Sequence, residues 1–157
     1  MIKDTGKTRM TAEGEVVSLH TAKKLRKAGF DIEVVGSYDL ASNGQFMRCM
    51  TGKKWNYNEH EFTVSAPTLK EAASWLESVH NIKVSAYADG YEQMQGIMGT
   101  YNGRRLWCAK IEELDKPKEE RFGIIWETYY SESGALDAAI YKACQIILDD
   151  FEIYLDE

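Results

Sequence analysis

The sequence lacks any long apolar run. None of its apolar stretches approaches the roughly 20 residues that a helix needs to cross a bilayer. Residues 1–7 contain neither the apolar stretch nor the small-residue cleavage site of a secretory signal. We therefore expect a cytoplasmic protein that makes no contact with a membrane.

Cysteine is scarce and widely spaced. The three cysteines, Cys49, Cys108 and Cys144, are odd in number and include no C-x-x-C pair, which argues against a disulfide framework and against a structural zinc site. Each cysteine lies among apolar neighbours, where a reduced thiol behaves as a small hydrophobic side chain. We expect all three to be reduced and to have no functional role.

The short motifs of common catalytic and cofactor sites are also missing. The sequence has no G-x-x-x-x-G-K-[ST] phosphate loop, no H-E-x-x-H metal motif and no G-x-S-x-G nucleophile turn. In the segment Glu59-His60-Glu61, adjacent side chains on an extended chain would point in opposite directions. The sequence therefore predicts no catalytic residues, no metal ligands and no cofactor.

The charge balance is acidic. The chain has 25 acidic residues against 19 basic ones, a net charge of −6, whereas proteins that bind nucleic-acid phosphates usually carry a basic face. Nucleic acid is therefore not an expected partner overall, although a local basic patch stays open as a weaker hypothesis. The candidates for such a patch are Lys23, Lys24, Arg26 and Lys27 on one predicted helix, with Lys53, Lys54, Arg104 and Arg105.

The chain contains enough residues for one compact core. Its 157 residues, 44% of them hydrophobic, correspond to the usual size and composition of a single domain. No stretch rich in Pro, Gly or Ser indicates a linker between domains. We expect a flexible polar lead-in over residues 1–14 and a single domain over residues 15–157.

Three helices are predicted from their capping residues. Ser18 is a suitable N-cap for the first helix, because its hydroxyl can accept a hydrogen bond from an unpaired first-turn N–H group. Thr68 and Glu71 form a capping box at the start of the second helix, and either Ser131 or Ser133 can cap the third. The predicted helices span residues 18–28, 68–80 and 133–149.

Apolar residues recur at helical spacing in the second and third helices, so that each presents one stripe to the core. The stripe of the second helix consists of Leu69, Ala72, Ala73, Leu76 and Val79. That of the third consists of Leu136, Ala139, Ile140, Ala143, Ile147 and, if the helix continues that far, Phe151.

Alternating apolar and polar residues predict strands in the remaining segments. Asn43-Gly44 favours a tight turn, and Asp89-Gly90 and Asn102-Gly103 divide residues 82–114 into three strands. Strands that tight turns join must be antiparallel. The predicted fold class is α+β: an antiparallel sheet, arranged as a meander of hairpins, with about three amphipathic helices packed on one face. The strands span residues 30–40, 45–51, three segments of 82–114, and 122–130.

Three segments together resemble one group of proteins. They are VSLHTAKKLRKAGFD at residues 17–31, the segment at 65–82 that contains SAPT and WLESVHNI, and the final helix after Tyr129-Tyr130. In these segments, about half of the chain, it resembles a group of small uncharacterised proteins of Bacteroides-type bacteria and their phages. The resemblance implies a shared architecture and a phage or mobile-element origin. Because the group has no assigned activity, the resemblance implies no site residues.

Aromatic residues are the most conspicuous remaining feature. Four Trp, nine Tyr and five Phe make up 11% of the chain, and several lie near predicted turns. Half-exposed aromatic side chains on a sheet are typical of binding surfaces, and they are also typical of the cross-strand pairs that stabilise a sheet. The candidate binding residues are Trp55, Tyr57, Tyr87, Tyr91 and Tyr101.

These observations leave three hypotheses about function. The first is a non-enzymatic protein-interaction domain of phage or mobile-element origin, with a protein partner that the sequence does not identify and with self-association left open. The alternative is a small-molecule-binding domain or an enzyme whose site is scattered over the sheet. The weakest is nucleic-acid binding through the basic patch. A deep pocket with converging polar groups would favour the alternative, whereas a shallow or apolar surface would favour the first.

Overall fold

The computed structural model describes residues 7–57, 62–117, 119 and 122–149. Within these residues there are three α-helices and eight strands, and the strands form three antiparallel sheets, which confirms the α+β prediction. The helices are α1 (Leu19–Lys27), α2 (Leu69–His80) and α3 (Glu132–Leu148), with short 3₁₀ turns η1 (Leu40–Ser42) and η2 (Trp55–Tyr57). The strands are β1 (Arg9–Thr11), β2 (Gly14–Val16), β3 (Val34–Asp39), β4 (Gln45–Lys53), β5 (Thr63–Ser65), β6 (Ile82–Gly96), β7 (Gly99–Glu113) and β8 (Phe122–Tyr129).

The helices begin at the caps that the sequence indicates. The hydroxyl of Ser18 accepts from the N–H of Thr21 at the start of α1. The capping box of α2 is complete: the Glu71 N–H donates to Thr68 Oγ1 at 3.1 Å, and the Thr68 N–H donates to Glu71 Oε1 at 2.8 Å. For α3 the cap is Ser131 rather than Ser133. The three predicted helices are confirmed to within two residues at each end.

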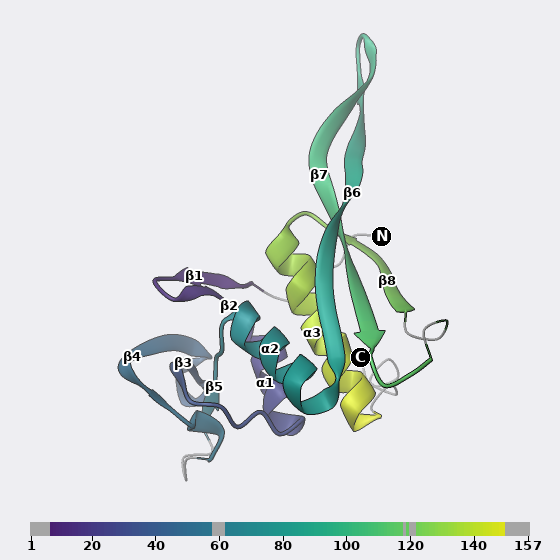
Figure 1. The fold of residues 1–157 in the computed structure, drawn as a ribbon. Helices are drawn as coiled ribbons and strands as arrows, with labels where there is room; N and C mark the ends of the chain where they lie inside the picture. Colours follow the sequence, from purple (N-terminus) through teal and green to yellow (C-terminus); the bar gives the residue numbers. More distant parts are fainter. Residues whose placement is uncertain (1–6, 58–61, 118, 120–121, 150–157) are drawn as a thin grey trace.

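The strands form three sheets rather than the single sheet that was predicted. β3 lies between β4 and β5, β7 lies between β6 and β8, and β1 pairs only with β2. The helices lie between the two three-stranded sheets (Figure 1), with α3 against β6, β7 and β8, and α1 against β5. The three helices therefore do not all pack on one face of a single sheet. Instead, the two three-stranded sheets cover different sides of the helices.

Residues 82–114 form one long hairpin instead of three strands. β6 and β7 are 15 residues each, and the chain reverses at Ile97 and Met98, between them. The prediction of turns at Asp89-Gly90 and Asn102-Gly103 is wrong.

Both predicted turn segments lie within the strands. Gly90 has the positive φ of +85° that a turn would use, but it lies at a register shift between Ala88 and Tyr91, where it forms a bulge. Asn102 pairs with Gln93 across the hairpin. A glycine with positive φ serves a bulge as well as a turn, so that the local sequence did not distinguish the two.

Part of the expected lead-in forms a strand. β1 lies within residues 1–14 and pairs with β2 in the register Arg9↔Val16 and Thr11↔Gly14. Val16 in turn bridges to Thr68 at the start of α2. Residues 1–6 lie outside the described part of the chain.

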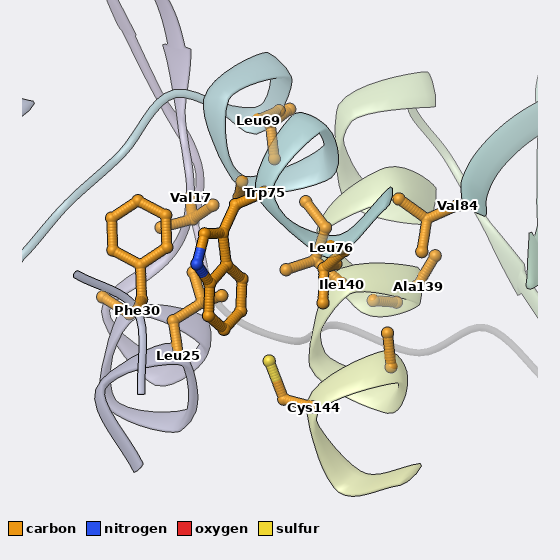
Figure 2. Packing of buried hydrophobic residues seen from close by; sticks show 14 of the residues in the cluster. Val17, Leu25, Phe30, Leu69, Trp75, Leu76, Val84, Ala139, Ile140 and Cys144 are labelled. Carbon is orange, nitrogen blue, oxygen red and sulfur yellow. The ribbon is translucent and has the colours of Figure 1, made fainter. Parts of the chain in front are cut away.

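The core lies among the three helices and the adjoining faces of the sheets. Leu25, Phe30, Trp75, Leu76 and Ile140 are all at most 4% exposed and lie close together in Figure 2. The α3 stripe is confirmed at its fully buried positions Ala139, Ile140 and Ala143, while Leu136 and Ile147 are partly buried and Phe151 lies outside the described residues.

The stripe of α2 differs from its prediction at one position. Val79 is 55% exposed, and Trp75 occupies the core instead at 4% exposure. The Trp75 indole packs edge-on against Phe30, with ring centroids 5.3 Å apart. The large indole packs against Phe30, which follows α1 in the chain. Helical spacing within α2 alone does not predict this contact with another segment.

A buried carboxylate joins α3 to the beginning of α1. Asp137 is fully buried. Its Oδ1 accepts from the Ser18 N–H at 2.9 Å, and its Oδ2 accepts from the hydroxyls of Ser18 at 2.8 Å and Thr21 at 3.0 Å. A negative charge is favourable at a helix N-terminus, where the first N–H groups have no partner within the helix.

Candidate functional site

The outer part of the β6–β7 hairpin projects away from the rest of the molecule (Figure 1). β8 pairs with β7 only from Trp107 to Glu112, so that beyond Trp107 the ribbon has two strands. We call residues 88–106 the arm. Most of its residues are exposed, including the large hydrophobic side chains Tyr91, Met94 and Tyr101.

The end of the arm is apolar and fully exposed. Ile97 and Met98 have relative exposures of 104% and 99%, and they lie between Gly96 and Gly99, which pair across the hairpin. Single exposed apolar residues are common on protein surfaces, but two adjacent ones at the end of a projecting ribbon contact nothing that would bury them. We call Ile97 and Met98 the tip.

Behind the tip, one face of the arm carries large side chains that lie over glycines. A Cβ atom at Gly103 would approach Cγ of Met94 to 2.7 Å, and one at Gly96 would approach the Tyr101 ring to 3.0 Å. Met94 and Tyr101 are also directly paired across the two strands. The two glycines therefore leave room for these side chains to lie against the ribbon close to the tip.

Farther from the tip, an aromatic and charged cluster connects the arm to the end of β8. The guanidinium of Arg104 stacks on the Tyr130 ring, 3.4 Å from its centroid, and Arg104 Nη2 lies 3.5 Å from Glu92 Oε2. The Tyr130 hydroxyl donates to the same Glu92 oxygen at 2.6 Å. This hydrogen bond is the main reason why the pKa of Glu92 is below its usual value, and the pKa of Tyr130 is raised by the same contact.

A second stack of the same kind involves Arg105. Its guanidinium carbon lies 5.5 Å from the Tyr91 ring centroid and 5.7 Å from that of Trp107, and its Nη1 donates to the Tyr91 hydroxyl at 3.1 Å. Cation–π contacts of this kind contribute about 0.5–1 kcal/mol at exposed sites. Arginine and tyrosine thus hold each other in place on the arm before any partner binds.

Polar side chains link the two strands between this stack and the tip. Gln93 Nε2 donates to Asn102 Oδ1 at 3.1 Å, and Gln95 Nε2 donates to Thr100 Oγ1 at 3.4 Å. These four residues are exposed and uncharged. Their amide and hydroxyl groups can still bond to a partner, because each has capacity for more than one hydrogen bond.

The base of the arm contains a thiol that is poorly suited to react. The Cys108 Sγ donates to Asp89 Oδ2 at 3.0 Å, and Tyr87 pairs with Cys108 across the strands. Burial, with a further contribution from Asp89, raises the pKa of Cys108 to about 11. Because the thiolate is the reactive form of cysteine, this thiol is unreactive at neutral pH.

The structure separates the five sequence-predicted binding residues. Tyr91 and Tyr101 lie on the arm, and Tyr87 lies at its base. Trp55 and Tyr57 lie in η2, beside the other three-stranded sheet and far from the arm (Figure 1). The Trp55 indole N–H donates to the carbonyl of Val34 at 2.9 Å, which is a structural contact; the Tyr57 side chain lies outside what the structure describes.

The tip itself was missed by sequence analysis. Ile97 and Met98 were assigned to a strand, because Asp89-Gly90 and Asn102-Gly103 match the preferred hairpin sequences better. One signal could have found the tip. Gly96 and Gly99 enclose an apolar pair midway between the two stronger turn candidates, in a segment where polar side chains otherwise predominate.

A groove lies at the base of the arm. It has a volume of about 570 Å³ and is formed by β2, α2, β6 and the first turn of α3. Its floor is apolar, and charged residues line its rim. The floor consists of Leu69, Ala73, Val84, Ala86 and Leu136, and the rim includes Glu13, Glu15, Glu77, Glu132, Lys70 and Lys83.

The predicted basic residues do not form one patch. Lys24 is 4% exposed, with its ammonium 5.5 Å from the Tyr141 ring centroid, so that it does not share the outer face of α1 with Lys23 and Lys27. Arg104 and Arg105 lie on the arm, far from α1 (Figure 1). The basic side chains are therefore divided between distant parts of the molecule.

The described residues offer few other candidate sites. They include no group of three or more His, Cys, Asp or Glu that could hold a metal ion, and Glu59-His60-Glu61 lies outside them. Over the same residues no helix is both long and apolar enough to span a membrane. All three cysteines are free.

Comparison with known proteins gives no guide to function. No protein-family model, no curated protein and no solved structure matches the chain.

Proposed function

We propose that the chain is a protein-interaction domain, of phage or mobile-element origin, that binds its partner through the arm. The observation that carries this proposal is the complete exposure of Ile97 and Met98 at the end of an ordered ribbon. The origin rests on the sequence resemblance alone.

The composition of the arm supports a protein partner. Aromatic residues, methionine and arginine are enriched at the centres of protein interfaces, where lysine and aspartate are depleted. Tyr91, Tyr101, Met94 and Met98 provide such groups on the arm. The stacks on Arg104 and Arg105 hold the ribbon in one conformation, which reduces the conformational entropy lost on binding.

The charges of the arm also favour a protein over a nucleic acid. Asp89 and Glu92 balance Arg104 and Arg105, so that the arm has a formal net charge of zero. Both guanidinium groups are already stacked on aromatic rings. Because nucleic-acid affinity depends on neutralised phosphates, such an arm is better suited to an apolar protein surface.

A photocrosslinking experiment tests this function for a protein partner of any identity. A photoreactive phenylalanine analogue replaces Met98 in one variant and Met50 in the other. Met50 is a matched control, because it is also a nearly fully exposed methionine, at 93%, but lies on β4. Each variant is illuminated with the purified wild-type chain and, separately, with a lysate of Bacteroides-type bacteria.

We expect discrete protein adducts from position 98 and none from position 50. The same adducts from both positions, or no adduct from position 98 in either mixture, would contradict the proposed function.

A further inference from the structure

The molecule has both an exposed apolar tip and an apolar groove that could receive one. In the groove, Leu69 and Val84 of the floor are at most 8% exposed, and Ala73, Ala86 and Leu136 are partly buried. The tip presents two aliphatic side chains with no contact to bury them. A foreign partner bound at the tip would leave the groove open, whereas a second copy would cover both surfaces at once.

The position of the groove relative to the arm suits a reciprocal arrangement. Four consecutive residues of β6, Lys83–Ala86, line the groove, and Gly96 at the end of β6 adjoins the tip. At about 3.3 Å per residue, the ten steps along the strand from Ala86 to Gly96 span about 33 Å. If two copies lie side by side with their β6 strands antiparallel, the tip of each reaches the groove of the other. The two-fold axis would pass near Tyr91, midway between groove and tip.

The edge of the sheet leaves room for such a neighbour. β6 is an outer strand in the order β6-β7-β8, and within the described residues no strand pairs with its other side. Since Lys83 and Ser85 line the groove together with Val84 and Ala86, the groove continues round this edge as well as over one face. Unpaired edge strands are sites where a second chain adds.

Charge does not oppose this association. The chain has a net charge of −6, which in general keeps copies apart. The arm, however, carries two acidic and two basic residues, so that two antiparallel arms meet without net repulsion. An interface of this kind is isologous, because each copy contributes the same two surfaces, and it closes at two chains.

We propose that the groove receives the Ile97–Met98 tip of a second copy, so that two chains form a closed dimer through reciprocal arms. This inference rests on the proposed function, since it takes the arm as the interacting element and names its partner. The dimer buries the exposed tip in an apolar groove of the same molecule.

Sedimentation velocity over a concentration series tests the dimer with two pairs of matched variants. Met98→Asp places a charge at the tip, and Met50→Asp makes the same change on β4. Ser74→Arg obstructs the groove, and Ser78→Arg makes the same change at another exposed position of α2 that does not line the groove. Far-UV circular dichroism confirms that each variant is folded.

We expect the wild type, Met50→Asp and Ser78→Arg to dimerise alike. Met98→Asp and Ser74→Arg should each weaken dimerisation by about tenfold or more, as expected when a central anchor is lost or its pocket is filled. A disulfide trap adds a direct test of the contact. In a Cys49→Ser background, Met98→Cys chains mixed with Ser74→Cys chains should form a covalent dimer, and Met98→Cys mixed with Ser78→Cys should not.

Two results would overturn the inference: a wild type that stays monomeric at every concentration, or a dimer that neither Met98→Asp nor Ser74→Arg weakens. A monomeric wild type that still crosslinks from position 98 to another protein would leave the proposed function intact. A monomeric wild type without any crosslink from position 98 would refute both.

Discussion

The arm and the rest of the molecule, which we call the body, are ordered by different interactions. In the body, Leu76 and Ile140 are fully buried and packed among three helices. In the arm, Ile97 and Met98 are fully exposed, and the ribbon is held by cross-strand pairs and by arginine–aromatic stacks. Residues that determine stability are therefore separate from residues that are available for recognition.

This separation explains how an exposed two-stranded ribbon can remain ordered. An isolated hairpin is at best marginally stable in water. Here both strands continue into a three-stranded sheet that packs on α3, so that their lower halves are fixed by the core. The arm needs additional order only over the residues beyond Trp107, where its arginine–aromatic stacks and its cross-strand side-chain hydrogen bonds provide it.

The largest expected effect is on the core side of this comparison. Leu76→Ala should lower the free energy of unfolding by about 2–5 kcal/mol, because it leaves a cavity at a fully buried position. Met98→Ala should change it by less than about 0.5 kcal/mol, since surface substitutions outside special contacts have little effect. Denaturant melts of the two variants measure both values. Equal losses of unfolding free energy in the two variants would show that the tip contributes to stability as much as the core does.

A second effect should arise at the buried link between α1 and α3. Asp137→Ala removes the carboxylate that accepts from the Ser18 N–H and from the hydroxyls of Ser18 and Thr21, so that the buried Ser18 N–H loses this acceptor and the two hydroxyls keep only each other and the carbonyl of residue 137. We expect a loss of about 2–3 kcal/mol in the free energy of unfolding. Asp137→Asn, which keeps one carbonyl acceptor, should lose less. If both variants melt like the wild type, the carboxylate does not contribute to stability.

A smaller effect should appear at alkaline pH. Burial raises the pKa of Cys144 from 9.0 to about 12. Between pH 9 and pH 12, the Cys144 thiol therefore stays protonated in the folded state but ionises in the unfolded state. Its contribution to the free energy of unfolding is complete below pH 9 and is lost as the pH rises toward 12. One pH unit above the unfolded value, the loss should be about 1 kcal/mol.

The measured quantity is the change in the free energy of unfolding per pH unit, rather than the free energy of unfolding at one pH. Denaturant melts are compared over this pH range for the wild type and for Cys144→Ala, in which the decline should be shallower. A parallel decline in the two proteins would show that other groups, such as Tyr38, whose pKa burial raises to about 12, account for it.

Sequence alone determined the features that depend on neighbouring residues. The caps at Ser18 and Thr68 form as predicted, and Asn43 and Gly44 both have positive φ where the chain reverses between β3 and β4, although η1 also belongs to that connection. Each depends on a side chain that bonds to backbone within a few residues, or on a residue that tolerates positive φ. Helical spacing likewise identified most of the core of α2 and α3, although it placed Val79 where Trp75 is buried.

Tertiary structure decided which of several locally acceptable arrangements was adopted. Gly90 fits a turn or a bulge equally well, and the continuous pairing of β6 with β7 selected the bulge and placed Ile97 and Met98 at the tip. The division into three sheets and the groove between β2, α2, β6 and α3 also depend on contacts between residues far apart in the chain. Propensity and periodicity describe only the conformations open to each segment; the packing of segments against one another selects among them, and it was this selection that exposed the arm.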